Sequence, residues 1–405
     1  MRSREIRPHI GIFGHTNVGK SSFINAITGQ DISLVSDLAG TTTDPVDKSV
    51  ELTGLGPVVL VDTAGWGDPS ALGEARASRT RKVLKIIDAA ILLIAGNAIS
   101  ATEKALINHF KEEAIPFLLV HNKSDLGLWQ GTGASLPGDK QVLEYSSISR
   151  QDPWPVLREL KRIVPDSAFN RQPLIGDLVA YGDIVMMIVP IDLEAPEGRL
   201  ILPQVQAIRD ILDNDAIAII LKEREVDVFL KKTNIKPSLV ITDSSIFNKA
   251  DAMIPGDILL TGFSVMLARF KGNFEAYLQG TPRISSLEDG DRILLLESCS
   301  HHASCDDIGR VKIPRWMSNF TGKKLHFDVV AGLDDMPGPI SDYALVVQCG
   351  GCMVTRRQLI NRLKPALDAG IPVTNYGMAI AYVQGVYERA VAPFVNRAGP
   401  GTTYL

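Results

Sequence analysis

The stretch from His9 to Ser22, HIGIFGHTNVGKSS, joins an apolar run to a helix-like run through a loop with two glycines, a lysine and two serines. Its residues from Gly14 to Ser21 fit the pattern G-x-x-x-x-G-K-[ST]. Glycines in such a loop let backbone N–H groups curl around an anion, and the following helix N-terminus adds a partial positive charge. The stretch therefore predicts a phosphate-binding loop between a buried strand and a helix. The alternative interpretation is a glycine-rich turn with a surface lysine.

The side chains of this loop have separate expected roles. We expect Lys20 to reach the β- and γ-phosphates of a nucleotide, and the Ser21 hydroxyl to be a ligand of Mg²⁺. The nucleotide-binding residues predicted in the loop are Asn17, Val18, Gly19, Lys20, Ser21 and Ser22.

Two further segments complete the expected magnesium and phosphate contacts. VVLVDTAG places Asp62 and Gly65 directly after a buried strand, with Asp62 in the metal shell and the Gly65 N–H toward the γ-phosphate. LAGTTTD supplies Thr42, which is expected to close over Mg²⁺ when the γ-phosphate is present. The predicted Mg²⁺ ligands are therefore Ser21, Thr42 and Asp62.

A third segment predicts the identity of the base. PFLLVHNKSD ends a buried strand with Asn122, Lys123 and Asp125. A carboxylate such as Asp125 accepts both hydrogens from the N1–H and N2–H₂ edge of guanine, and adenine offers no such pair. Ser146 and Ser147, in EYSSIS, are expected near the same base. Together these motifs predict a domain that binds and hydrolyses GTP.

The order and spacing of these motifs resemble those of the translation-factor-related GTPases, in particular the tRNA-modification and ribosome-assembly group, over roughly residues 8 to 165. Ras-like enzymes orient water with a glutamine at the position held here by Trp66. The resemblance instead implies a K⁺ ion, held partly by Asn17, as a fixed positive charge at the reacting phosphates. It also implies Glu74 as the water-orienting residue, and slow intrinsic hydrolysis that K⁺ stimulates. Packing in the switch region is the alternative interpretation of Trp66.

Length and composition set the outer limits. A chain of 405 residues, 45% hydrophobic and 22% charged, is expected to form two or three domains. Its net charge of −4 argues against nucleic acid as a partner. No apolar run is long enough to span a bilayer, and the first residues show no apolar signal core. The expected location is the cytoplasm, with no membrane association.

The alternation of apolar runs and helix-like runs predicts an α/β fold with mainly parallel sheets in three domains. Residues 1–168 are predicted to form the GTPase domain. Residues 169–256 contain three short apolar runs and one amphipathic helix but no catalytic constellation, which favours a dimerisation domain. Residues 257–405 are predicted to form a third α/β domain, in which TGFSVMLARFKGNFEAYLQG is a single helix.

The four cysteines all lie in this third domain, at Cys299, Cys305, Cys349 and Cys352. Cys299 follows the apolar run RILLLES, and Cys349 follows YALVVQ. In parallel sheets, ligands gather beyond the carboxyl ends of the strands, so both runs are expected to deliver their cysteines to one rim.

Three kinds of site remain open from these residues. Cys299, His301, Cys349 and Cys352 supply the Cys₃His set of a structural zinc site. Three thiolates also suffice for a [4Fe–4S] cluster whose fourth iron has another or an exchangeable ligand. The Cys349-Gly350-Gly351-Cys352 pair alone is consistent with a redox dithiol.

The C-terminal pattern resembles that of the [FeFe]-hydrogenase maturation GTPases of the HydF family. It consists of a cysteine, a histidine two residues later, a long gap and then C-x-x-C, and it follows an N-terminal GTPase domain. The likeness covers essentially the whole chain. It implies GTPase, dimerisation and cluster domains in that order, and a scaffold that carries a [4Fe–4S] cluster and a diiron precursor. The implied partners are a second copy of the chain, the two radical-SAM maturases and the apo-hydrogenase that receives the precursor.

The fourth cluster ligand stays open. The motif favours His301, and His302, Asp306 and Asp307 are near enough in sequence to compete. An exchangeable ligand suits a scaffold, because an incoming diiron unit needs a place to attach. Cys305 lies outside the motif and is interpreted as a spare or buried thiol.

Two other functions compete with this one. The first is a GTPase for RNA modification or ribosome assembly with a structural zinc site. Only two modest basic stretches, LKKTNIK and RWMSNFTGKK, support it. The second is a GTPase whose C-terminal domains only bind a partner, and it predicts no metal.

Overall fold

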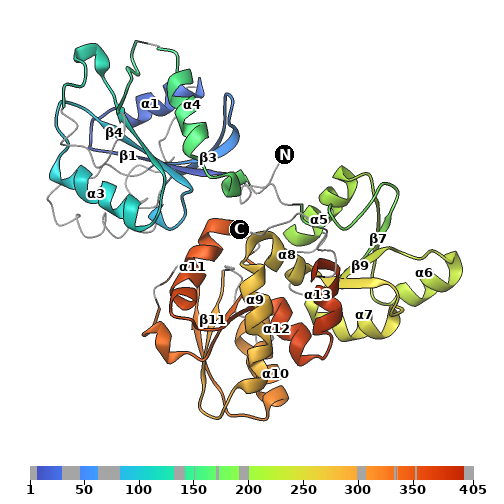
Figure 1. Ribbon diagram of the computed structural model, residues 1–405. Coiled ribbons are helices and arrows are strands. Elements are labelled where there is room, and N and C mark those ends of the chain that lie inside the picture. The colour runs from blue at the N-terminus through green and yellow to red at the C-terminus, as the bar shows by residue number, and fades with distance from the viewer. Residues whose placement is uncertain are drawn as a thin grey trace. The chain divides into compact units, whose positions relative to one another are not determined.

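The structure is a computed structural model that describes residues 7–29, 46–62, 83–131, 142–149, 151–169, 173–190, 200–298, 307–332, 334, 336–351 and 354–395. The chain forms two compact units (Figure 1). The first contains residues 1–171 with 356–358, and the second contains residues 172–355 with 359–405.

The first unit is a six-stranded sheet with helices along it. Its strands are β1 (His9–Gly14), β2 (Val46–Leu52), β3 (Gly56–Asp62), β4 (Ala89–Ile94), β5 (Phe117–His121) and β6 (Val142–Glu144). Its helices are α1 (Lys20–Thr28), α3 (Ala101–Glu112) and α4 (Trp154–Ile163). The strand order is β2-β3-β1-β4-β5-β6, and every pair is parallel except β2 with β3.

Burial explains why the central strands of this sheet are apolar. All residues of β1, β4 and β5 are buried, and separate hydrophobic cores lie on the two faces of the sheet. Parallel sheets covered on both faces need continuous apolar runs, which is the pattern in the sequence. The antiparallel edge strand β2, whose sequence VDKSVEL alternates, was not predicted.

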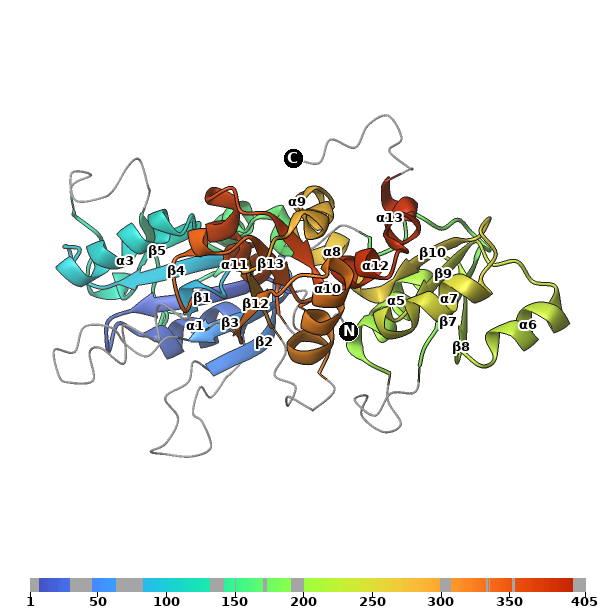
Figure 2. The same ribbon diagram turned by 90° about the horizontal axis from the view of Figure 1, so that it is seen from below.

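The second unit begins with a four-stranded parallel sheet. Its strands are β7 (Ile184–Ile188), β8 (Ile217–Leu221), β9 (Leu239–Thr242) and β10 (Leu259–Gly262), in the order β10-β9-β7-β8. The helices are α5 (Leu202–Asp213), α6 (Val226–Thr233), α7 (Phe247–Met253) and α8 (Phe263–Lys271). Strand β8 lies at one edge (Figure 2). Because β10 pairs with β9, this sheet extends past the boundary predicted after residue 256.

The predicted helix over TGFSVMLARFKGNFEAYLQG is wrong in one respect, because it is two helices. α8 ends at Lys271, and α9 (Phe274–Gly280) begins after Asn273, whose side chain accepts a hydrogen bond from the N–H of Ala276. Gly272 is extended between them, and a Cβ there would lie 2.4 Å from the Tyr277 ring. The glycine and the capping asparagine together break the helix.

A second parallel sheet completes this unit. Its strands are β11 (Arg292–Leu296), β12 (His326–Val330), β13 (Leu345–Gln348) and β14 (Val373–Asn375), in the order β12-β11-β13-β14. The helices are α10 (Ile313–Thr321), α11 (Arg356–Asp368), α12 (Tyr376–Val383) and α13 (Tyr387–Val395). The three-residue strand β14 is too short to give a periodic signal and was not predicted. The expected parallel α/β architecture is confirmed in both units.

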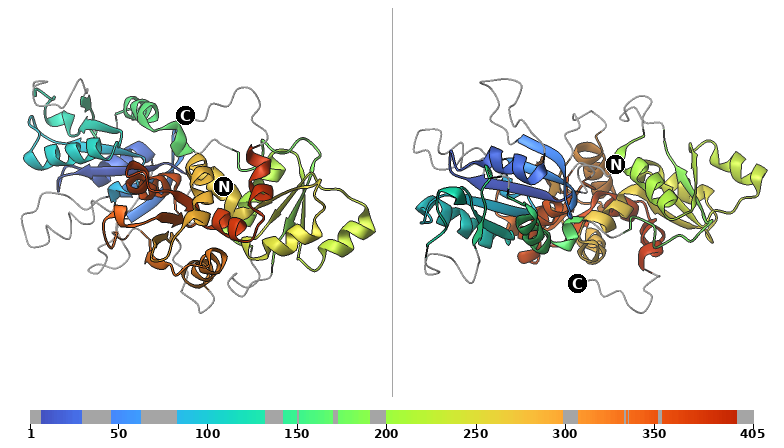
Figure 3. Two further views of the ribbon diagram at one scale, coloured as in Figure 1. Left: turned by 60° about the horizontal axis from the view of Figure 1, so that its bottom comes forward. Right: turned by 90° about the horizontal axis from the view of Figure 1, so that it is seen from above.

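One hydrophobic core includes residues from both sheets of the second unit. Figure 3 shows helices from the gold and red parts of the chain between these sheets, among them α8, α12 and α13. The Thr261 hydroxyl at β10 donates to the Ala390 carbonyl of α13 at 2.8 Å, and Arg389 pairs with Asp251 at 2.7 Å. The last helix therefore packs against the first sheet of the unit.

Among the described residues, no helix is both long and apolar enough to cross a membrane.

Candidate functional site

The phosphate-loop motif lies where the sequence predicts it, between the end of β1 and the start of α1. The Lys20 ammonium donates to the carbonyls of Gly14 and His15, at 2.9 Å each. Burial lowers the pKa of Lys20, and the negative charge of Asp62 at the end of β3 partly opposes that shift. Lys20 and Asp62 therefore interact at the carboxyl edge of the sheet. This is the edge where parallel α/β sheets bind ligands.

Gly19 is required at this site for two reasons. Its φ of 95° is in the left-handed region, and a Cβ would lie 2.5 Å from the Asn122 side-chain nitrogen. That nitrogen donates to the Val18 carbonyl at 2.9 Å, and Lys123 donates to the Asn17 carbonyl at 2.8 Å. The two residues that follow β5 thus hold the phosphate loop in place.

The predicted base-recognition residues also come together. The Ser147 hydroxyl donates to the Asn122 side-chain oxygen at 2.8 Å, and the Ser146 hydroxyl donates to the Asp125 carboxylate. The loops after β5 and β6 are therefore joined by these bonds. Asp125 is exposed, which suits a carboxylate that accepts hydrogen bonds from guanine.

Ser21 and Ser22 are exposed in the first turn of α1, and Asn17 is exposed in the loop. The other residues predicted for the nucleotide site, Thr42, Gly65 and Glu74, lie outside the described residues, as does Trp66.

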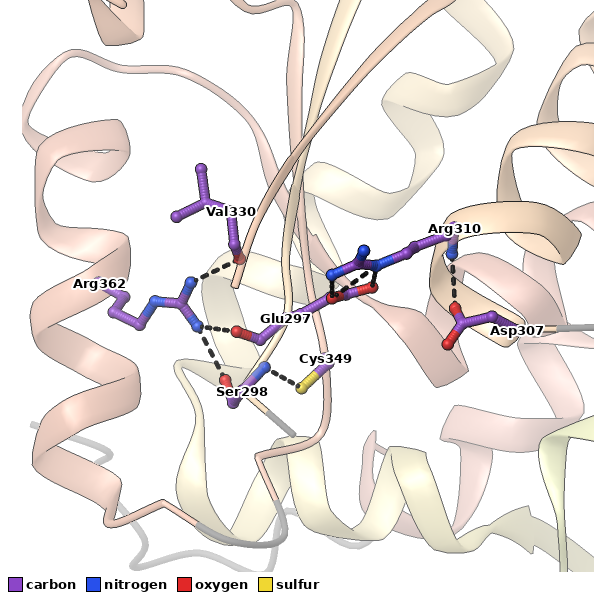
Figure 4. A network of polar contacts seen from close by, with 7 residues as sticks. All are labelled: Glu297, Ser298, Asp307, Arg310, Val330, Cys349 and Arg362. Carbon is purple, nitrogen blue, oxygen red and sulfur yellow. Dashed lines mark hydrogen bonds and ion pairs between the residues drawn. The ribbon is translucent and has the colours of Figure 1, made fainter. Parts of the chain in front are cut away.

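The two strands predicted to deliver cysteines are neighbours in the second unit. β11 pairs with β13 in parallel, with Leu296 opposite Gln348. Cys349 directly follows β13 and is 6% exposed, and its Sγ accepts a hydrogen bond from the Ser298 N–H at 3.0 Å (Figure 4). Ser298 immediately precedes Cys299 in the chain. The structure therefore places the residue before Cys299 against the sulfur of Cys349.

A buried arginine fixes the chain at this point. Arg362 of α11 donates to the Glu297 carbonyl at 2.6 Å, to the Ser298 hydroxyl at 2.9 Å and to the Val330 carbonyl at 3.0 Å. Figure 4 shows its guanidinium at the ends of β11 and β12. Burial lowers the pKa of Arg362, and the negative potential of Cys349 is the largest opposing contribution.

The far end of the segment from residue 299 to 306 is anchored to the same strand end. Arg310 donates to both carboxylate oxygens of Glu297, at 2.8 to 3.1 Å. The Asp307 carboxylate accepts the Arg310 N–H at 2.7 Å, at the start of a π-helical turn (Ile308–Lys312). Arg310, which Asp307 caps, is therefore tied to Glu297 at the end of β11.

Several metal-ligand candidates from the sequence lie outside the described residues: Cys299, His301, His302, Cys305, Asp306 and Cys352. Of the predicted ligands, the structure describes Cys349 and the weaker candidate Asp307. Within the described part of the chain, no group of three or more histidine, cysteine, aspartate or glutamate side chains is arranged to hold a metal.

Two buried cations of this site were missed by the sequence analysis. Lys271 ends α8 after the apolar run FSVMLARF, and its ammonium donates to the carbonyls of Gly351 and Val354 at 3.1 and 3.0 Å. Arg362 shares the buried face of α11 with Leu359, Leu363 and Ala366. A charged residue within an apolar stripe is the sequence signal that indicates both positions.

Three domain families match the chain in succession. Residues 9–123 match the 50S ribosome-binding GTPase family, residues 174–272 match the hydrogen maturase F dimerization domain, and residues 275–393 match the hydrogen maturase F tetramerization domain. The chain belongs to the hydrogen maturase F family. Its N-terminal part is a GTPase domain.

Individual relatives that match part of the chain are GTPases. The tRNA modification GTPase MnmE of Laribacter hongkongensis is 37% identical over 120 residues, which are 29% of this chain and 26% of that protein. GTPase Der of Wolinella succinogenes is 47% identical over 93 residues, 22% of this chain and 19% of that protein. A solved structure of Era from Aquifex aeolicus gives a TM-score of 0.34 at 17% identity, over 55% of this chain and 97% of that one. The chain spans about a quarter or less of the length of these MnmE and Der proteins.

The two hydrogen maturase F domains indicate the oligomeric state and the surroundings of Cys349. The dimerization and tetramerization domains indicate a homodimer or a higher oligomer. Lys271 belongs to the first of these domains and donates to the Gly351 carbonyl in the second, so the two domains adjoin two residues after Cys349.

Proposed function

We propose that this protein is a GTP-hydrolysing scaffold for hydrogenase maturation. It binds a [4Fe–4S] cluster, carries a diiron precursor and delivers the precursor to apo-[FeFe]-hydrogenase, and it works with radical-SAM maturases. The observation that carries the proposal is the 3.0 Å hydrogen bond from the Ser298 N–H to the Cys349 sulfur, at adjacent strand ends within a hydrogen maturase F domain.

The described residues fit a thiolate-bound cluster. Consecutive Cα atoms are about 3.8 Å apart, so a Ser298 backbone held at the Cys349 sulfur keeps the next Cα within reach of one shared cluster. Gly351 has a φ of 61°, which allows the tight turn that leads into Cys352. An N–H donated to a sulfur is the kind of hydrogen bond that tunes iron–sulfur sites. Cys299, Cys349 and Cys352 are therefore the proposed ligands.

The cluster supplies an anionic iron centre with one position left for an exchangeable ligand or for the cargo. His301 is our first candidate for the fourth ligand, and Asp306 is the second. Asp307 is less suited, because its carboxylate already caps the turn at Arg310. This chain's own contribution is to hold the two strand ends together and to exclude water from the Cys349 sulfur.

The nucleotide half of the proposal follows from the GTPase domain. Ser21 and Asp62, with Thr42, are the proposed Mg²⁺ ligands, and Asp125 selects guanine. Asn17 is the proposed K⁺ ligand, and Glu74 orients the attacking water. Bound GTP or its hydrolysis is expected to change the switch segments Thr41–Thr43 and Gly65–Glu74 and thereby to alter contact with a partner or with the cluster domain.

Reconstitution with iron and sulfide under anaerobic conditions tests the cluster directly. Wild-type protein is expected to gain visible absorbance typical of an iron–sulfur cluster, and Cys349→Ser is expected to lose most of it. Asp125→Ala serves as the matched control, because it disables the nucleotide site and is expected to keep the absorbance. GTP hydrolysis by Cys349→Ser shows that its GTPase domain is folded, and an unchanged oligomeric state on size-exclusion chromatography shows that its second unit is folded. A full spectrum in Cys349→Ser would contradict the ligand assignment.

A further inference from the structure

Lys271 is a buried cation beside the predicted cluster turn. Its side chain is 0% exposed, and its ammonium donates to the carbonyls of Gly351 and Val354. These two residues lie on either side of residues 352 and 353. Removing an ammonium from water is unfavourable unless nearby groups compensate for the lost hydration. A lysine placed here therefore fixes the backbone on both sides of the turn.

Arg362 has the same relation to the other strand end. It is 9% exposed and donates to the backbone of Glu297 and to the side chain of Ser298. One buried cation thus contacts Gly351, two residues after Cys349, and the other contacts Ser298, whose N–H donates to the Cys349 sulfur. One comes from α8 in the dimerization domain, and the other comes from α11 in the tetramerization domain.

The residue before Cys349 is fixed as well. The Tyr277 hydroxyl donates to the Gln348 side-chain oxygen, and Gln348 in turn donates to the Leu359 carbonyl at 3.1 Å. Asn375 donates to the Gln348 carbonyl at 3.2 Å. Such a satisfied buried network specifies one conformation of the strand end. The backbone that leads into Cys349 is therefore held in one conformation.

We propose that Lys271 and Arg362 are positioning residues that also stabilise a more negative charge state of the centre bound at Cys349. The inference rests on the proposed function. One electron from an external low-potential reductant adds one negative charge to a thiolate-bound cluster. Net charge and hydrogen bonds to the sulfurs set the reduction potential of such clusters. Two buried cations therefore favour the reduced form and raise the potential.

An EPR-monitored redox titration of reconstituted full-length protein, with dithionite as reductant, tests this. Lys271→Met and Arg362→Met are each expected to shift the midpoint potential to more negative values, or to lose iron while the GTPase activity is unchanged. Arg362→Lys keeps the charge and is expected to restore the midpoint toward wild type. Lys364→Met is the matched control on α11, because Lys364 is 63% exposed and pairs with Asp368, and it is expected to leave the midpoint unchanged.

The outcomes separate the two proposals. Wild-type protein that takes up no iron overturns the proposed function and this inference together. Equal midpoint potentials and equal iron content would overturn this inference alone, if they are found in cluster-loaded wild type, Lys271→Met and Arg362→Met. If Lys271→Met does not fold, the comparison of Arg362→Met with Arg362→Lys still decides, because only the methionine removes the charge.

Discussion

At the scale of single residues, Gly19 and Gly29 lie at the two ends of helix α1 and differ in the space around them. Both have positive φ, but a Cβ at Gly19 would clash with the Asn122 side chain, whereas nothing lies within 4 Å of a Cβ at Gly29. Either change to alanine is expected to cost about 1 kcal/mol of stability through backbone strain. Only Gly19→Ala displaces the amide that holds the phosphate loop. We therefore expect Gly19→Ala to weaken GTP binding by about tenfold or more.

Fluorescent GTP-analogue titration measures this difference. Gly29→Ala is the matched control and is expected to bind as the wild type does. Equal affinity of the two variants would contradict the assigned role of the bond from Asn122 to Val18.

Asp88, just before β4, makes stability depend on pH. Burial raises its pKa from 3.8 to about 6, and the hydrogen bond from the His9 N–H partly opposes that shift. The folded state therefore binds the proton more tightly than the unfolded state. The resulting stabilisation is fully present below about pH 4 and is lost as pH rises through about 6.

Between pH 5.5 and 7.5 this group is expected to lower the free energy of unfolding by about 1 kcal/mol. Chemical denaturation of wild type and Asp88→Asn at both pH values checks the prediction. The asparagine variant keeps an acceptor for the His9 N–H and is expected to lose this part of the pH dependence. An unchanged dependence in Asp88→Asn would show that another group is responsible.

At the scale of elements, the edge strand β8 is the clearest candidate for self-association. Its side chains Ile217 and Ile220 are 50% and 42% exposed, and a strand at the edge of a sheet has backbone groups that can pair with another strand. We expect the double change Ile217→Lys and Ile220→Lys to raise the dissociation constant of the dimer at least about tenfold.

Analytical ultracentrifugation over a range of concentrations measures that change. Val228→Lys is the control, because Val228 is 51% exposed on the neighbouring helix α6 and lies outside the strand. A dimer that resists the double change on β8 but dissociates with Val228→Lys would place the interface on the helix instead.

The sequence predicted the elements whose periodicity is strong and missed those decided by tertiary contacts. The buried strands β1, β5, β7, β11 and β13 are continuous apolar runs and are where they were expected. β14 has three residues, and β2 has a polar, alternating sequence, so neither gave a clear signal. The break between α8 and α9 depends on a contact of Gly272 with Tyr277 that only the folded chain reveals.

The candidate site shows the same division. The motif residues Lys20, Asp62 and Asn122 could be predicted because fixed spacing encodes their chemistry. Lys271 and Arg362 stand within apolar stripes, which is a signal for their positions, but their partners could not be predicted because these are backbone carbonyls far away in the sequence. Such partners become apparent only when the strands and helices are placed together.

At the scale of the whole molecule, the two hydrogen maturase F domains share one hydrophobic core within the second unit. The Lys271 ammonium and the bond from Thr261 to Ala390 cross between them. A change at the dimerization sheet therefore has a direct physical route to the turn after Cys349. The GTPase domain is a separate compact unit.

The central claim is that Cys299, Cys349 and Cys352 bind one iron–sulfur cluster. Iron, zinc and acid-labile sulfide, quantified per chain in protein purified and reconstituted without oxygen, test it most directly. We expect about four irons and four sulfides with little zinc in the wild type, and a large loss of iron in Cys299→Ser. One zinc per chain without iron would contradict it and would favour a GTPase with a structural zinc site.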